Sequence, residues 1–270
     1  MQDKPQSVSL IISTYNWPQA LELVLCSVAE QTIIPNEVII ADDGSREDTK
    51  QLIETLNLRL NLPIKHIWHE DKGFRLAKIR NMAIASSTSE YIIQIDGDII
   101  IHPRFIADHI KFAKSGSFVR ASRIYINEET SNTMLKEHHS KINAFSKGIT
   151  NFFSALRIPF LWSYFEDNYK NKGDERYEIH GANMAYWRKD AIRVNGYNED
   201  FNGWGPEDKE FITRLLNTGI KKRFIKLGAV AFHIYHKENP KTFLEENVKL
   251  FKDAITKKKT VIKNGINQYV

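Results

Sequence analysis

Short apolar runs alternate with helix-like segments over the first hundred residues, and this alternation limits the folds open to the chain. Strand-forming runs occupy residues 8–12, 37–41, 64–68 and 91–95. Between them, residues 18–28 and 76–85 repeat apolar side chains at helical spacing, and acidic residues follow Ser45 as in a first helical turn. Strands that alternate with helices form a parallel sheet covered by helices. We therefore predict an α/β fold with a Rossmann-like, mostly parallel sheet.

Polar side chains follow three of the four predicted strands. The clusters are Ser13 with Tyr15, Asp42 with Asp43, and Asp96 with Asp98. Ligands of such sheets bind beyond the carboxyl ends of the strands, so the three clusters should meet at one edge. Three polar clusters at the same edge favour a binding site over ordinary turns. No G-x-G-x-x-G follows the first strand, which argues against a dinucleotide-binding fold.

The Asp96-Gly97-Asp98 segment has two interpretations. An Asp-Gly pair is a strong signal for a hairpin turn, here between the fourth strand and the apolar residues 99–101. Alternatively, carboxylates beside a buried strand need a partner, and a divalent metal that carries phosphates is a suitable one. The position of the segment after the fourth strand of a parallel sheet favours the metal site.

Composition excludes some classes of protein. Net charge is +5, from 38 Lys and Arg against 33 Asp and Glu. This mild excess suits an anionic ligand or a membrane surface, and it lacks the dense basic stripe of a nucleic-acid binder. A single cysteine, Cys26, and the lack of a signal peptide or apolar span predict a cytoplasmic protein. The lysine-rich tail around residues 257–259 is either a packed helix or a peripheral contact with an anionic membrane.

A Gly-Trp-Gly-Pro-Glu-Asp element at residues 203–208 opens a predicted helix. Asp208 lies on the same face as the apolar residues that follow it, so its carboxylate should point inward. Glu207 and Asp208 either complement the helix dipole only, or they meet a substrate, with Asp208 as an ionised base. The indole of Trp204 suits stacking on a sugar ring.

Residues 229–236 form a predicted strand that contains two histidines. On a strand, His233 and His236 would point to opposite faces, so they should not share a metal unless the chain bends. Residues 127–178 are harder to interpret. The aromatic-rich residues 145–165 are a core segment, an acceptor-binding lid or a surface that touches lipid, and core is the default expectation.

The first-half motifs resemble those of family 2 glycosyltransferases with the GT-A fold. The matching segments are V-S-L-I-I-S-T-Y-N at residues 8–16, D-D-G-S at 42–45 and D-G-D at 96–98. The resemblance implies a metal held against the diphosphate of a nucleotide-sugar by the last motif, a uracil contact for Asp43, and a nucleotide pocket lined by Ser13 and Tyr15. It assigns nucleotide-sugar contacts also to Asp96 and Gly97.

A basic segment at residues 73–81 extends this resemblance. It matches the family's helix beside the nucleotide and assigns Arg80 and Asn81 to the nucleotide-sugar, with Arg75 and Lys78 as further candidates. The alternative for Lys78 and Arg80 is a solvated helix face, because they lie off the apolar stripe.

The G-W-G-P-E-D element resembles that of β-1,4-galactosyltransferases and chondroitin-polymerase-like bacterial enzymes. The resemblance implies that Asp208 is the catalytic base, that Glu207 contacts the acceptor and that Trp204 closes over the donor. It also makes His236 a metal ligand together with Asp98. His233 stands where those enzymes have methionine, so His233 and Asp96 are further candidates as ligands.

Together these motifs predict one GT-A domain with a nucleotide half, about residues 1–125, and an acceptor half, about residues 126–270. The implied reaction is the transfer of a hexose or N-acetylhexosamine, with inversion, from a UDP-sugar to a hydroxyl of a glycan or glycolipid. Mn²⁺ or Mg²⁺ is the implied cofactor. The alternatives are a metal-dependent sugar nucleotidyltransferase and a non-catalytic glycan-binding module.

Overall fold

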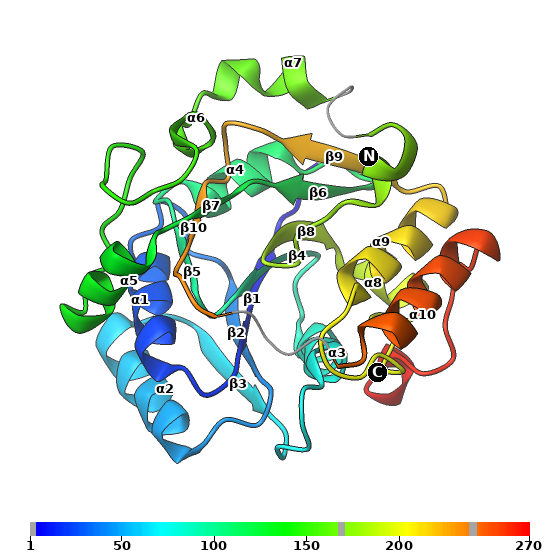
Figure 1. The fold of residues 1–270 in the computed structure, drawn as a ribbon, viewed down its shortest axis with the longest axis horizontal. Coiled ribbons are helices and arrows are strands. Elements are labelled where there is room, and N and C mark those ends of the chain that lie inside the picture. The colour runs from blue at the N-terminus through cyan, green and yellow to red at the C-terminus, as the bar shows by residue number, and fades with distance from the viewer. Residues whose placement is uncertain (1–3, 167–170, 238–241) are drawn as a thin grey trace.

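The predicted strands and helices of the first half are present and in order. The computed structural model describes residues 4–166, 171–237 and 242–270 (Figure 1). The parallel strands β1 (Val8–Thr14), β2 (Glu37–Asp42), β3 (Ile64–Trp68) and β4 (Tyr91–Asp96) lie in the order β3-β2-β1-β4. The helices between them are α1 (Pro18–Ala29), α2 (Glu47–Leu60) and α3 (Leu76–Ser86).

Three later strands extend the same sheet to seven. β8 (Asn183–Trp187) runs antiparallel to β4, β6 (Ser117–Ala121) lies next, and β9 (Lys221–Ile225) forms the edge parallel to β6. The predicted mostly parallel sheet of an α/β protein is therefore confirmed, with β8 as its antiparallel member.

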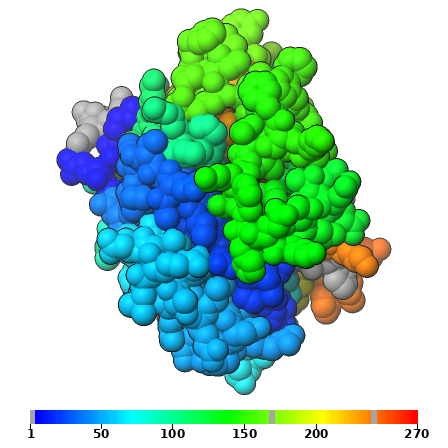
Figure 2. Space-filling view, turned by 90° about the vertical axis from the view of Figure 1, so that its left-hand side faces the viewer, coloured from blue at the N-terminus to red at the C-terminus, as the bar shows by residue number. Residues whose placement is uncertain are grey.

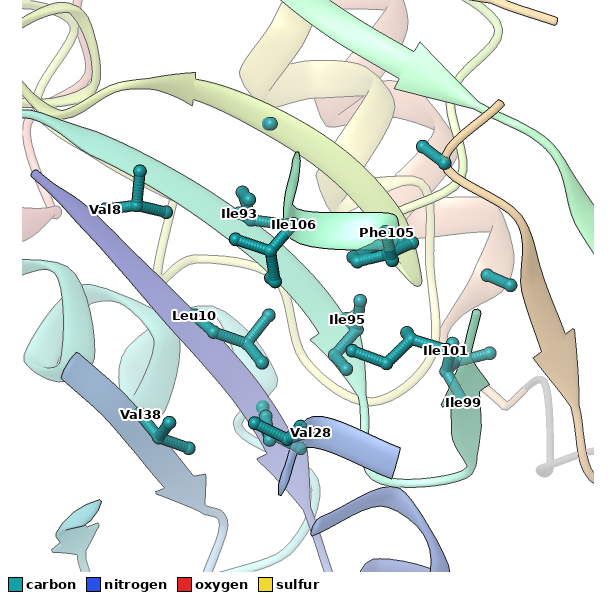
Figure 3. Packing of buried hydrophobic residues seen from close by; sticks show 14 of the residues in the cluster. Val8, Leu10, Val28, Val38, Ile93, Ile95, Ile99, Ile101, Phe105 and Ile106 are labelled. Atoms are coloured by element: carbon teal, nitrogen blue, oxygen red, sulfur yellow. The ribbon is translucent and has the colours of Figure 1, made fainter. Parts of the chain in front are cut away.

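Alternate side chains of the central strands point to opposite faces of the sheet and pack into two separate hydrophobic cores. Leu10 of β1 packs with residues of α1, α2 and α4 (Phe105–Phe112), as the close view in Figure 3 shows for part of this cluster. Its neighbour Ile11 points to the other face, where α3, α8 (Arg188–Arg193) and α9 (Glu207–Asn217) cover the sheet. Both faces are apolar because β1 is buried throughout.

The pairing of a small second sheet distinguishes the two interpretations of Asp96-Gly97-Asp98. The strand after it, β5 (Ile99–Ile101), pairs antiparallel with β10 (Ala231–His233) and not with β4. β10 also pairs with β7 (Arg123–Tyr125). The hairpin interpretation is therefore wrong, because the turn carries the chain from the large sheet into the small one.

One predicted strand is shorter than expected, and another stretch of extended chain is divided between the two sheets. Residues 118–126 divide between β6 and β7, which belong to different sheets, and the carbonyl of Ser122 between them accepts a hydrogen bond from Asn183. The strand predicted at 229–236 ends at His233, where Ile234 N–H donates to the carbonyl of Asp98. The competing partners are Asn183 of β8 in the large sheet and Asp98, the residue before β5 of the small one.

The aromatic-rich middle is mostly not core, which corrects the default expectation. Phe145, Phe153, Phe160 and Tyr164 are more than 70% exposed, whereas Trp162 is buried. The middle contains α5 (Glu128–Lys136), α6 (Phe152–Ala155), η1 (Pro159–Leu161), α7 (Trp162–Glu166) and η2 (Gly173–Tyr177). In Figure 1, α5 lies at the left and α6 and α7 lie at the top of the molecule, and the green residues cover the upper and right-hand parts of the face seen in Figure 2.

The tail forms α10 (Leu244–Thr256), which packs against α9, followed by η3 (Ile266–Gln268). The packed helix expected for the tail is therefore present. None of the helices in the described part of the chain combines the length and apolar character needed to cross a membrane.

Candidate active site

The loops after β1, β2 and β4 meet at the carboxyl edge of the sheet, as predicted. Ser13 lies beside Asp96 in the register of β1 and β4, and Thr14 lies beside Asp42 in that of β1 and β2. Gly97 N–H donates to the carbonyl of Ser13 over 2.7 Å, and a Cβ at Gly97 would lie 3.0 Å from that oxygen. The Asp96-to-Asp98 turn therefore needs glycine to lie this close to β1.

Asp43 occupies a buried position at this edge. His69 Nε2 lies 2.6 Å from its Oδ1, and the backbone N–H of Arg75 donates to its Oδ2 over 2.9 Å. Tyr15 is half-exposed and donates to Asp71 over 3.0 Å. Hydrogen bonds thus tie the loop before α3 to Asp43 and Tyr15 at the polar edge of the sheet. The sequence analysis did not single out His69, because no spacing linked it to Asp43.

Arg80 is the central cation of the site. Its side chain is 1% exposed, and its guanidinium lies 2.9 Å from Asp208, 3.1 Å from Asp96 and 3.4 Å from Glu207. Burial lowers the pKa of Arg80, but the negative charge of Asp208 and then the charges of its other partners raise this pKa by more than burial lowers it. The guanidinium therefore stays protonated. The solvated-face interpretation is therefore wrong for Arg80.

Asp208 stands in the first turn of α9, and hydrogen bonds hold one of its two carboxylate oxygens. Its Oδ1 accepts from Arg80 and lies 3.2 Å from the Tyr197 hydroxyl. Its Oδ2 packs on Gly181, where an added Cβ would come within 2.0 Å. Gln94 of β4 lies 2.9 Å from the Tyr197 hydroxyl and donates to the Gly181 carbonyl.

The sequence analysis missed Tyr197, Gln94 and Gly181 as parts of this site. A single polar residue in the apolar run of β4 was the available signal for Gln94. Tyr197 and Gly181 lie in loops with no spacing relation to Asp208, so only the fold brings them together.

Glu207 is buried beside Asp208, and its Oε2 has no hydrogen-bond partner among the described residues. Burial and then the charge of Asp208 raise the pKa of Glu207 to about 8, although Arg80 opposes this shift. A protonated Glu207 is a hydrogen-bond donor beside Arg80 and Asp208.

Glu207→Gln tests this protonation. A carboxyl whose pKa is raised in the fold contributes stability that is present below its unfolded value of 4.5 and is lost as pH rises through about 8. Between about pH 5 and pH 8 the thermal midpoint of the metal-free wild type should therefore fall more than that of the Glu207→Gln variant. Parallel pH profiles would contradict the protonated state.

Asp98, His233 and His236 form the one cluster of potential metal ligands found among the described residues. Their ligand atoms lie within 4.8 Å of one another, with each Nε2 3.3 Å from Asp98 Oδ2. Asp98 Oδ1 has no hydrogen-bond partner in the described chain. One carboxylate and two imidazoles are a donor set that fits a divalent transition metal.

The bend after β10 explains why both histidines reach Asp98. β10 ends at His233, so the expectation that the two side chains point to opposite faces of a strand does not apply. Asp96 instead points to Arg80 and lies outside this cluster.

Trp204 and Asn81 lie at the margins of the site. Trp204 lines a cavity of about 410 Å³ together with Phe74, Arg75 and Phe243. Asn81 is fully buried, and its amide bonds to the backbone of Tyr197 and to Glu199. The structure therefore does not bring the Asn81 side chain to the polar edge, where it would meet a nucleotide.

Comparison with known proteins identifies the family. The model described as "Glycosyl transferase family 2" matches residues 9–194, more than half of the chain. The chain belongs to glycosyl transferase family 2. A second model, "N-terminal domain of galactosyltransferase", matches residues 165–237. This part of the chain contains the G-W-G-P-E-D element, His233 and His236. Both halves of the resemblance seen in the sequence are thus confirmed.

Individual relatives agree with this assignment. This glycosyltransferase is 30% identical over 239 residues to chondroitin synthase from Escherichia coli, with 84% of the chain aligned. The chain spans about a third of that relative, 34% of its length.

Two solved structures share the fold. S. aureus TarS 1-349 with UDP-GlcNAc has a TM-score of 0.61 at 18% identity, over 87% of this chain and 60% of TarS. GalNAc-T7 with UDP, GalNAc and Mn²⁺ has a TM-score of 0.66 at 16% identity, over 93% of this chain and 50% of that one. The expected GT-A-like fold is confirmed.

Proposed function

We propose that this glycosyltransferase moves a hexose or N-acetylhexosamine from a UDP-sugar to a hydroxyl of a glycan or glycolipid acceptor, with inversion. The observation that carries the proposal is the link through Arg80, which joins Asp208 to Asp96, two residues from the Asp98 cluster. Arg80 thereby connects the proposed base to the turn that carries the candidate metal site. Family membership favours sugar transfer over nucleotidyl transfer.

The polar edge of the sheet would bind the nucleotide. Asp43 already accepts two hydrogen bonds, but a carboxylate has about four acceptor positions, so it can also accept from a uracil N–H. Ser13 and Tyr15 would line the same pocket, and Trp204 would cover the donor sugar. The crystal structure of TarS 1-349 is a complex with UDP-GlcNAc, which supports a UDP-linked donor here.

Asp98, His233 and His236 would hold a divalent cation, which when bound neutralises charge on the departing diphosphate. Two imidazoles among three donors favour Mn²⁺ over Mg²⁺, because Mg²⁺ prefers oxygen ligands and keeps its waters. The crystal structure of GalNAc-T7 contains Mn²⁺ together with UDP, in agreement with that choice.

Asp208 would take the proton of the acceptor hydroxyl as it attacks the sugar. Arg80 and Tyr197 fix its Oδ1, which leaves Oδ2 as the acceptor of the proton. Glu207 would hold the acceptor through its unpaired Oε2. Direct attack from the face opposite the leaving group inverts the anomeric centre, so no covalent enzyme intermediate is needed. The base therefore comes from the proposed acceptor half, and Asp96 and Asp98 come from the nucleotide half.

The proposed function is tested by UDP release from a panel of UDP-sugars, with and without Mn²⁺ and acceptor glycans. A transferase releases UDP in a metal-dependent and acceptor-stimulated way. Release of inorganic diphosphate from a sugar phosphate and UTP would identify a nucleotidyltransferase instead. Sugar binding that ignores metal and nucleotide would identify a glycan-binding module.

Asp98→Ala and His236→Ala should each lower metal-dependent turnover by at least about 100-fold, because each removes a ligand. Both should also abolish the extra thermal stabilisation that Mn²⁺ gives to the UDP complex, which at 100 times the Kd is about 2.7 kcal/mol. His138→Ala is the matched control, since this exposed histidine pairs only with Glu22 among its described partners. Unchanged Mn²⁺ dependence in both ligand variants would overturn the metal site.

A further inference from the structure

An exposed set of aromatic side chains lies outside the proposed active site. We call it the aromatic band and define it by residues on the connection from α5 to α7: Phe145, Phe152, Phe153, Phe160 and Tyr164, which are 81%, 38%, 74%, 81% and 78% exposed. Figure 2 shows the green residues, which include this connection, over the upper and right-hand parts of one face of the molecule. Large aromatic side chains this exposed usually mark an interaction surface.

The backbone beneath the band is fixed to the protein. Thr150 exchanges hydrogen bonds with the backbone of Tyr125 at the end of β7, and Asn127 N–H donates to the carbonyl of Gly148 over 2.7 Å. Trp162 is buried and donates to the carbonyl of Leu227 over 2.8 Å. The rings themselves pack on one another, with Phe152 5.4 Å from Phe145 and 5.6 Å from Phe153 between centroids. The exposed rings therefore stand on a defined base.

The charge of this segment is one-sided. Residues 138–165 contain no Asp or Glu, although the chain has 33 in 270 residues. The cations of the segment include Lys141 and Lys147, both exposed. Arg157 is different, because it pairs with Asp108 over 2.7 Å. Aromatic rings with interspersed lysines and no acids complement an anionic interface.

We propose that the aromatic band docks this protein onto an anionic phospholipid surface. Aromatic rings insert at the level of the headgroups, and lysines gain from the negative surface potential of the lipid. A second copy of the chain fits less well, because it would bring the lysines of two bands together, whereas interface cores are depleted of charge.

The position of the band gives this docking a consequence that rests on the proposed function. Tyr125, which hydrogen-bonds to the segment at Thr150, contacts the ring of His233 at a centroid distance of 5.3 Å. The segment that carries the band is therefore linked at Thr150 to Tyr125, which contacts a residue of the proposed metal cluster. Docking would hold the site beside acceptors that are anchored in the lipid.

The band also replaces the tail as the expected membrane contact. Lys257 and Lys259 both pair with Asp253, over 2.7 Å and 2.5 Å, so part of the positive charge of the tail is compensated. α10 in addition packs on α9.

Co-sedimentation with vesicles tests the proposal, with phosphatidylcholine alone compared with a mixture of phosphatidylcholine and phosphatidylglycerol. The wild type should bind the mixed vesicles. A Phe145→Ser/Phe153→Ser/Phe160→Ser variant and a Lys141→Glu/Lys147→Glu variant should each bind them at least about tenfold more weakly. The controls are Leu58→Ser, which removes a side chain 87% exposed on α2, and Lys257→Ala/Lys259→Ala. Both controls should bind like the wild type.

Thermal unfolding and the UDP–Mn²⁺ thermal shift show whether each variant is folded, and they do not depend on lipid. Three results would overturn the docking proposal. The first is that both band variants bind mixed vesicles as well as the wild type does. The second is that only the tail variant loses binding. The third is that the wild type does not bind mixed vesicles, whether or not the band variants alter self-association. A failure of vesicle binding with intact UDP–Mn²⁺ binding leaves the proposed function standing.

Discussion

Asp208→Asn should lower kcat for sugar transfer by about 10²–10⁴-fold, the usual contribution of a general base. Asparagine has the shape of aspartate but cannot accept the proton of the acceptor hydroxyl. Arg80 would keep Asp96 and Glu207 as partners, so the variant should fold. Its thermal shift with UDP and Mn²⁺ should equal that of the wild type, because Asp98, His233 and His236 are unchanged.

Asp200→Asn is the matched control, since Asp200 is an exposed acid whose carboxylate bonds to Asn264. Its kcat should stay at the wild-type value. Gly181→Ala gives an independent test, because the added Cβ would come within 2.0 Å of Asp208 Oδ2 and must displace it. Full transfer by Asp208→Asn would remove Asp208 from the role of base.

Arg80→Met should lower the free energy of unfolding by about 3–5 kcal/mol at neutral pH and abolish transfer. The substitution keeps most of the side-chain volume but leaves Asp96, Glu207 and Asp208 without their shared cation. The free energy of unfolding of Arg80→Lys should lie between those of Arg80→Met and the wild type, because an ammonium is a point charge and cannot form the same fork of hydrogen bonds. Chemical denaturation of the metal-free proteins measures the loss of stability in both variants.

The stability loss of Arg80→Met should depend on pH. Burial raises the pKa of Asp96 and of Glu207, and the charge of Arg80 opposes both shifts. Without the guanidinium these two pKa values should rise further, so the folded state binds more protons and loses stability as pH rises. The difference from the wild type should therefore be larger at about pH 8 than at about pH 5.

Arg214→Lys is the control for burial, since Arg214 is fully buried and pairs with Glu210 on the same helix. It should lose stability and keep more kcat than Arg80→Lys. Equal losses of kcat in the two variants would mean that Arg80 acts only through general stability.

Local sequence patterns predicted the parallel half of the fold because each signal lies within a few residues of its element. Apolar runs buried on both faces specify β1, β2 and β4, and helical spacing specifies α1 and α3. Polar residues at strand ends then predicted the edge where the loops meet, because parallel strands share a direction. The aromatic segment shows the limit of this approach, since composition does not say which side of a chain faces water.

The sequence alone determined which chemical groups this protein has: a D-G-D turn after β4, a G-W-G-P-E-D helix start, and two histidines near the end of a strand. The tertiary structure decided which of them meet. Pairing of β5 with β10 ends the strand at His233 and brings both histidines to Asp98. The burial of Arg80 between the α3 face and α9 joins Asp96 to Asp208. Each outcome depends on at least one contact between residues more than 100 positions apart, which no local spacing encodes.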